Sequence, residues 1–109
     1  MTNMKSVSSD ISPTALLRAL ADPLRERIVR LLTREALCTC HLVAETGAGQ
    51  TNVSNHLRLL RRAGLVSTEP HGRYTYYRLR PEALRVLAAD LGGLADAAET
   101  NSEIRRPCP

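Results

Sequence analysis

The chain has 109 residues, which suits one small domain, and its three cysteines are an odd number that argues against a disulfide framework. It has no phenylalanine or tryptophan, so its core must be aliphatic, and a core this small favours oligomerisation. No apolar run approaches the roughly 20 residues of a membrane-spanning helix, and residues 1–13 lack the apolar stretch of a secretion signal. We therefore expect a soluble, cytoplasmic protein.

Positive charge is concentrated in one segment. The net charge is +4, and residues 50–80 hold six arginines against the single acid Glu69. A local excess of arginine on a compact segment is the pattern expected for contacts with nucleic-acid phosphates. A solvated arginine face without a partner is the alternative.

The first elements in chain order are a polar arm over residues 1–12, expected to be flexible, and then four helices. A serine or aspartate followed by proline marks the first two helix starts, and glycines mark the ends of the next two helices. The sequence thus predicts helices that begin at Pro13 and Pro23, a short helix from about Cys38 to Thr46, and a longer one from about Thr51 to Ala63.

A hairpin and a last helix complete the predicted domain. Two β-prone stretches, 65–69 and 74–79, flank Pro70-His71-Gly72-Arg73 and predict a β-hairpin with a basic tip. Pro81 begins a helix with an aliphatic stripe from Leu84 to Ala98, and residues 99–109 are predicted to form a flexible tail that carries Cys108.

This element order predicts a mainly α (α+β) fold: a winged helix-turn-helix over residues 13–98, with five helices and a two-stranded β-hairpin wing. The first and last helices carry aliphatic stripes that a monomer of this length can hardly cover. We expect a homodimer formed through these two helices.

Three segments carry a resemblance to a known family. "LRALADPLRERIVRLL", "QTNVSNHLRLLRRAGLV" and "HGRYTYYRL", in this order and spacing, resemble the ArsR/SmtB family of metal-sensing bacterial repressors over roughly residues 13–98. The resemblance implies a homodimer that binds operator DNA and releases it when a metal or metalloid is bound. Two recognition helices about one helical turn of DNA apart predict a palindromic operator.

The longer helix is expected to enter the major groove with its N-terminal residues, where Gln and Asn suit bidentate pairing with adenine. Arginines further along the helix would hold phosphates, and the one at the hairpin tip would reach the minor groove or the backbone. The alternatives are that Gln50 or Thr51 caps the helix and that His56 has a packing or phosphate role. The candidate DNA-binding residues are Gln50, Thr51, Asn52, Ser54, Asn55, His56, Arg58, Arg61, Arg62 and Arg73.

The cysteines are the candidate ligands of the inducer. Cys38 and Cys40, in "LCTC", stand where the resemblance implies a C-x-C pair, and thiolates are soft ligands for arsenic(III), antimony(III), cadmium or lead. Thiols two positions apart do not share a side of a regular helix, so binding both to one ion would distort the first turn. The family's arsenic sensors often have a third cysteine where this chain has Val43, which leaves Cys108 as the candidate third sulfur. We expect arsenic(III) or antimony(III) as inducer and no organic cofactor.

The sequence is compatible with several alternatives. The same fold would suit a cadmium or lead sensor or a thiol-redox-sensing repressor, and the structural alternative is that the cysteines are only small apolar residues. His41, where the family commonly has aspartate, is more typical of a surface or capping residue than of a ligand. A zinc site on the last helix is disfavoured because that helix has no histidine. No enzyme is expected, since C-x-C is not the usual redox spacing, and the clustered arginines disfavour a protein-binding module.

Overall fold

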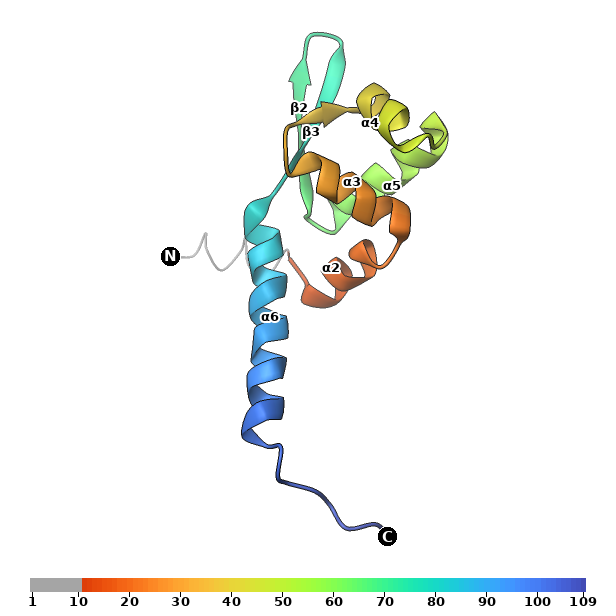
Figure 1. Ribbon diagram of the computed structural model, residues 1–109. Helices are drawn as coiled ribbons and strands as arrows, with labels where there is room; N and C mark the ends of the chain where they lie inside the picture. The colour runs from red at the N-terminus through yellow and green to blue at the C-terminus, as the bar shows by residue number, and fades with distance from the viewer. Residues whose placement is uncertain (1–10) are drawn as a thin grey trace.

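The structure, a computed structural model, describes residues 11–109, and within this range it has five helices and one three-stranded sheet (Figure 1). Residues 1–10, most of the predicted N-terminal arm, lie outside the described residues. The elements are α2 (Pro13–Leu20), α3 (Pro23–Leu32), β1 (Leu37–Cys38), α4 (Thr39–Thr46), α5 (Gln50–Arg62), β2 (Val66–His71), β3 (Tyr74–Leu79) and α6 (Pro81–Thr100).

The first two helices begin where the sequence predicts. The Ser12 hydroxyl accepts a hydrogen bond from the backbone N–H of Ala15, and the Asp22 carboxylate accepts from the N–H groups of Leu24 and Arg25. These side chains satisfy donors that a helix start leaves without partners. A proline in the first helical turn follows each cap, where its fixed φ favours the helix.

The core is aliphatic, as predicted, and joins all the helices. In the described part of the chain no polar or charged side chain is fully buried. Helix α5 contributes one face to this core, and its other faces are polar apart from Leu59, which is 41% exposed. The large side chains with the least exposure are Leu16, Ile28, Leu42, Leu57, Leu60, Leu65, Val53 and Val66.

The sheet differs from the predicted two-stranded hairpin in two respects. A third strand, β1, pairs antiparallel with β3 in the order β1-β3-β2, and places Cys38 opposite Tyr76. In addition, Pro70 and His71 belong to β2, so the turn contains only Gly72 and Arg73, with Gly72 at φ +63°. The predicted four-residue tip was wrong because β2 is an edge strand, where proline is tolerated.

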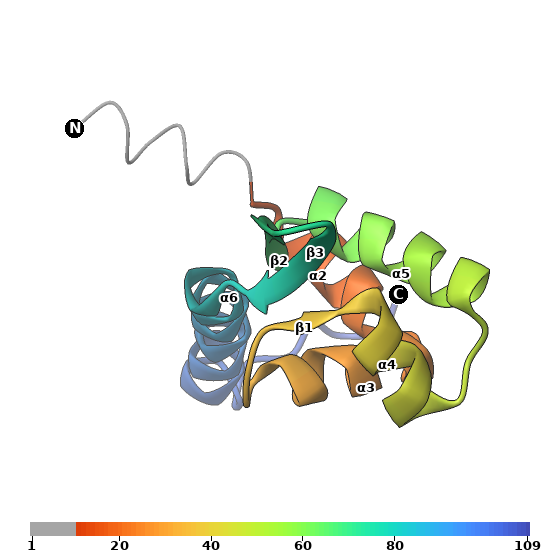
Figure 2. The ribbon, with the colours of Figure 1, turned by 90° about the horizontal axis from the view of Figure 1, so that it is seen from above.

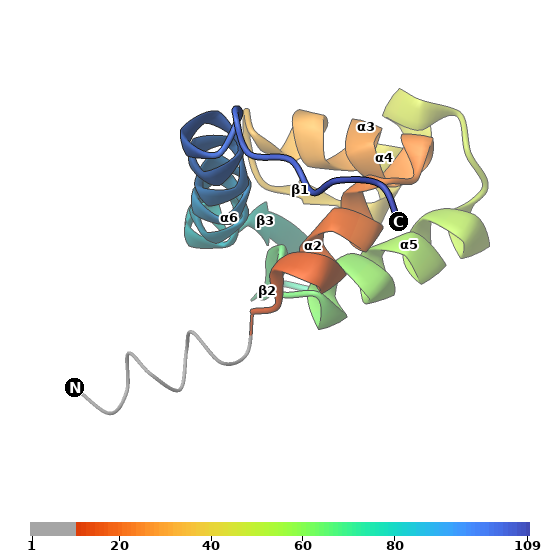
Figure 3. The same ribbon diagram turned by 90° about the horizontal axis from the view of Figure 1, so that it is seen from below.

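Helix α6 extends away from the body of the molecule. Figures 2 and 3 show it on the side of the body opposite α5, and Figure 1 shows its C-terminal half projecting beyond the other helices. Its first turns bury Ala83 and Leu87, whereas every residue from 88 to 100 is exposed. No helix within residues 11–109 has the length and hydropathy needed to cross a bilayer.

Candidate DNA interface and thiol site

Helices α4 and α5 form the helix-turn-helix, and the core fixes the orientation of α5. Val53, Leu57 and Leu60 are fully buried, so their spacing commits one face of α5 to the core. Gly47 ends α4 in the left-handed conformation at φ +75°, which a glycine adopts without strain. The connection to α5 is therefore short and sharply turned.

The N-terminal end of α5 is open and polar. Its N-cap is Gly49, and no side chain bonds to the free N–H groups there, so the expected capping by Gln50 or Thr51 is not observed. The first turn contains no acidic residue. Of the predicted base-reading residues, Ser54 and His56 are half-buried, and the exposed ones are Gln50, Thr51, Asn52 and Asn55.

Two of these side chains already have partners within the protein. The Arg58 guanidinium donates to the Asn55 side-chain oxygen at 3.0 Å, so the Asn55 oxygen must exchange this partner before it can accept from a base. Nδ1 of His56 lies 2.9 Å from Nη1 of Arg25 on α3. This second contact supports a packing role for His56, one of the roles expected from the sequence.

The arginines of the candidate interface are exposed on α5 and on the hairpin. Arg61 and Arg62 end α5, Arg73 stands in the hairpin turn, and none of the three forms an ion pair within residues 11–109. Arg78 of β3, in contrast, pairs with Glu69 of β2 at 2.7 Å. Free arginines on two neighbouring elements are suited to phosphate contacts on either side of a groove.

Cys38 is held at the junction of β1 and α4. It is the N-cap of α4 and is buried, and its sulfur lies 3.3 Å from Nδ1 of His41. The same Nδ1 accepts a hydrogen bond from the Cys38 backbone N–H at 3.2 Å. His41 therefore completes a capping box at this helix start, which confirms the expected capping role.

Cys40 lies in the first turn of α4, two residues after the cap, and its side chain is exposed. Both thiols line a shallow cavity of about 230 Å³, whose other walls are His41, Tyr74 and Tyr76. The rings of His41 and Tyr76 meet edge to face, with centroids 5.9 Å apart. No pattern in the sequence had placed Tyr74 and Tyr76 beside the cysteines.

Cys108 is not brought to this cavity within one chain. It is exposed in the segment after α6, and Figure 1 shows that the chain ends far below β1 and α4. Among residues 11–109, no group of three or more histidine, cysteine, aspartate or glutamate side chains is arranged to hold a metal ion. The predicted set of three sulfurs is therefore divided between the C-x-C pair and a distant tail.

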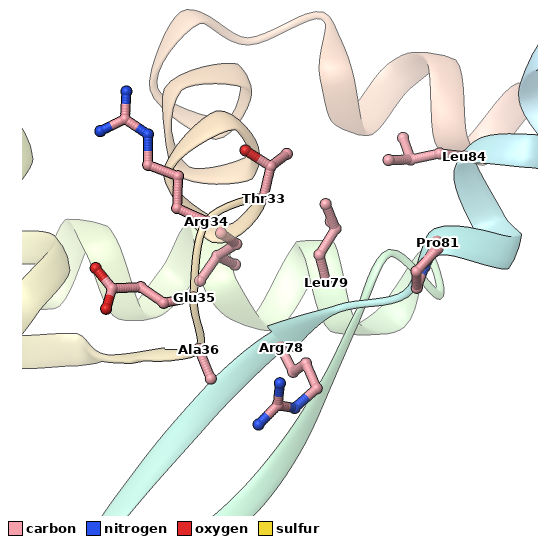
Figure 4. Close-up of a pocket in the computed structure, with 9 residues that line it drawn as sticks. Thr33, Arg34, Glu35, Ala36, Arg78, Leu79, Pro81 and Leu84 are labelled. Carbon is pink, nitrogen blue, oxygen red and sulfur yellow. The ribbon is translucent and has the colours of Figure 1, made fainter.

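A larger open cavity, of about 470 Å³, lies between the end of α3, the end of β3 and the start of α6 (Figure 4). It contains no cysteine and borders neither α5 nor the hairpin turn. Leu79 and Leu84 make part of its lining apolar, and the guanidinium groups of Arg34 and Arg78 extend to different sides in Figure 4. The two cations do not converge, so this cavity does not form an anion site.

Two carboxylates have lowered pKa values. The backbone N–H of Arg25 is the main cause at Asp22, where it holds the pKa below its ordinary value of 3.8. At Glu82 the main cause is its own backbone N–H, aided by Arg80, and the pKa is held below 4.5. Both carboxylates lie near helix starts, where the free N–H groups favour negative charge.

Taken together, a helix-turn-helix with an open, basic recognition helix and a hairpin beside it defines a winged helix-turn-helix DNA-binding protein. A family model described as "Bacterial regulatory protein, arsR family" matches residues 22–68. The arsenic resistance transcriptional regulator ArsR1 of Pseudomonas putida is 38% identical over 88 residues, which cover 80% of this chain and 69% of that protein. This chain belongs to the ArsR family of transcriptional regulators, which are DNA-binding transcription factors and not enzymes.

Other similar proteins agree with this assignment. The arsenical resistance operon repressor of Escherichia coli is 39% identical over 67% of this chain and 63% of its own length. The SmtB repressor of Mycobacterium tuberculosis is 41% identical over 69% of this chain and 56% of its own length. A crystal structure of a possible transcriptional regulator for arsenical resistance has a TM-score of 0.67 at 34% identity, covering 83% of this chain and 96% of that chain.

Proposed function

We propose that this repressor binds a palindromic operator as a cytoplasmic homodimer and releases it when arsenic(III) or antimony(III) binds its cysteine thiolates. The observation that carries the proposal is the position of Cys38 and Cys40, which share one cavity at the start of α4, directly before the recognition helix. The names of the P. putida and E. coli relatives add support for arsenic.

For the DNA contacts, we propose that the N-terminal end of α5 reads bases in the major groove. Its uncapped N–H groups and the absence of acidic residues from its first turn suit approach to a polyanion. Base edges would be read by Gln50, Thr51, Asn52, Ser54 and Asn55. Phosphates would be held by Arg58, Arg61 and Arg62, and Arg73 of the wing would reach the flanking backbone or minor groove.

We propose that α2 and α6 form the dimer interface, because both leave leucine side chains in water. Leu17 of α2 is 45% exposed, and Leu91 and Leu94 of α6 are 43% and 63% exposed. Helices α2 and α6 also pack against each other within the chain, so these leucines can contribute to one interface. Burying them against a second copy would also complete the small core.

In domain terms, we assign DNA binding and dimerisation to residues 13–98 and a ligand-carrying tail to residues 99–109. Helix α6 continues to Thr100, two residues beyond this boundary. The last nine residues are all exposed, and Cys108 is the next to last of the chain. We propose that Cys108 supplies the third sulfur, from its own or the partner subunit.

Release would begin at the start of α4. Cys38 is fixed by β1–β3 pairing, by the core around it and by His41, whereas Cys40 is exposed. To give both sulfurs to one ion, the chain must rearrange at residues 38–40 and separate the Cys38 sulfur from Nδ1 of His41. The change would pass through α4, which packs against α5. If the coupling free energy between metalloid binding and operator binding is about 1–3 kcal/mol, metalloid binding would lower operator affinity roughly 5- to 150-fold.

The test is a titration of operator-bound protein with arsenite, antimonite, cadmium, lead and zinc. We expect release by arsenite and antimonite, no response in Cys38→Ser or Cys40→Ser, and a weakened response in Cys108→Ser. An unchanged Cys108→Ser response would show that two protein sulfurs suffice. Release only by cadmium or lead, or only by an oxidant, would replace the arsenic assignment with the metal or redox alternative.

A further inference from the structure

One arginine connects three helices at the corner where α2, α3 and α5 meet (Figure 3). Arg25, in the first turn of α3, is half-buried. Its Nε donates to the backbone oxygen of Ala19 at 2.7 Å and its Nη2 to that of Arg18 at 3.3 Å. Its Nη1 lies 2.9 Å from Nδ1 of His56 on α5. Each of its three nitrogens therefore has a partner outside α3.

At the α2 end, the positive guanidinium of Arg25 lies at the C-terminus of the helix, which carries partial negative charge. Ala19 and Arg18 lie in the last turn of α2, where backbone oxygens carry partial negative charge, and the Arg18 oxygen also accepts from the backbone N–H of Ala21. A guanidinium there satisfies acceptors and complements the dipole. Lysine, with one nitrogen, cannot reproduce the planar set of three donors.

At the α5 end, the partner of Arg25 is a side chain of the recognition helix itself. Arginine only donates hydrogen bonds, so Nδ1 of His56 is the acceptor in this contact. His56 lies between the polar N-terminal turn of α5 and its arginines, in the middle of the candidate recognition surface. The contact therefore sets the position of α5 relative to α2, the helix proposed for the dimer interface.

We propose that Arg25 is a positioning residue for DNA recognition, which holds the recognition helix at a fixed orientation to the dimerisation helix through His56. This inference rests on the proposed roles of α5 and α2. It is independent of the inducer, because it concerns the protein without metalloid. In a two-fold dimer, the orientation of each α5 to its α2 sets the spacing of the two recognition helices, and hence the fit to a palindrome.

The experiment compares the affinity of the full chain for the duplex upstream of its own coding sequence with its affinity for a scrambled duplex. Arg25→Lys keeps the net charge, so scrambled-duplex affinity should change less than about twofold, because it depends on charge. Operator affinity should fall about tenfold, as expected for loss of hydrogen bonds to a charged group. Arg30→Lys, the same change at an exposed site of α3, should leave both affinities unaltered.

A second variant guards against a folding defect. His56→Leu removes only the α5 end of the connection and leaves the α2 oxygens bonded to Arg25. Operator affinity should fall in this variant too, and the double variant should lose much less than the sum of the two single effects. Unchanged operator affinity in Arg25→Lys, equal loss on both duplexes, or additive effects in the double variant would each overturn the proposal. Failure of arsenite to release the wild-type protein would bear only on the proposed inducer.

Discussion

Replacing Leu94 by glutamate tests whether α6 buries its apolar stripe against a second copy of the chain. Leu94 is 63% exposed in the single chain. Fully burying a leucine is worth about 1.5–3 kcal/mol, so roughly 1–2 kcal/mol per subunit is available at this position. A two-fold dimer contains the site twice, and the dimer should therefore be weakened by about 2–4 kcal/mol, or roughly 30- to 1,000-fold in its dissociation constant.

Sedimentation equilibrium over a range of concentrations measures this constant. The matched control is Ala89→Glu, which adds the same charge to α6 at an exposed position on the side of the helix away from the leucine stripe. We expect the control to dimerise as the wild type does. A monomeric wild type at micromolar concentration, or equal weakening by both substitutions, would refute the assignment of this face.

Four further outcomes follow from the structure. Leu57→Ala should lower the free energy of unfolding by about 2–5 kcal/mol, measured with urea, because Leu57 is fully buried. Arg61→Ala should weaken binding to operator and scrambled DNA alike. It should also reduce the slope of log affinity against log salt concentration by about 1 in magnitude. Gly47→Val should lower the melting temperature, because valine is strained at φ +75°, even though the space there is open. The Arg25 backbone N–H lowers the pKa of Asp22 in the folded state. The Asp22 carboxylate therefore stabilises the fold fully when the pH is above 3.8, the ordinary pKa, and this contribution is lost as the pH falls through the lower folded-state pKa. Asp22→Asn should therefore flatten acid unfolding below about pH 4, followed by circular dichroism.

The sequence was most informative where local chemistry decides the structure. Caps followed by proline set the starts of α2 and α3, and a 3.6-residue repeat set the buried face of α5. Strand β1 was not predicted because a strand of two residues shows no periodicity, and it forms only by pairing with β3. The hairpin turn was placed too early because Pro70 is read locally as a turn residue, whereas the edge position of β2 lets it stay in the strand.

The candidate site was predictable in part for the same reason. The C-x-C pair and the polar start of α5 are each one short continuous stretch of sequence, so their roles can be proposed from residue type and spacing. The cysteines and the tyrosines beside them are at least 34 positions apart in the sequence, and Arg25 and His56 are 31 apart, so no local pattern signals either contact. Such contacts arise only once the helices have packed.

The most direct test of the proposed coupling uses thermodynamic reciprocity. If arsenite binding at Cys38 and Cys40 weakens operator binding, operator binding must weaken arsenite binding by the same factor. Isothermal titration of the free protein and of the operator complex measures both affinities. We predict an arsenite affinity roughly 5- to 150-fold lower in the complex, matching the loss of operator affinity caused by arsenite. Equal arsenite affinities in the two states would contradict the account.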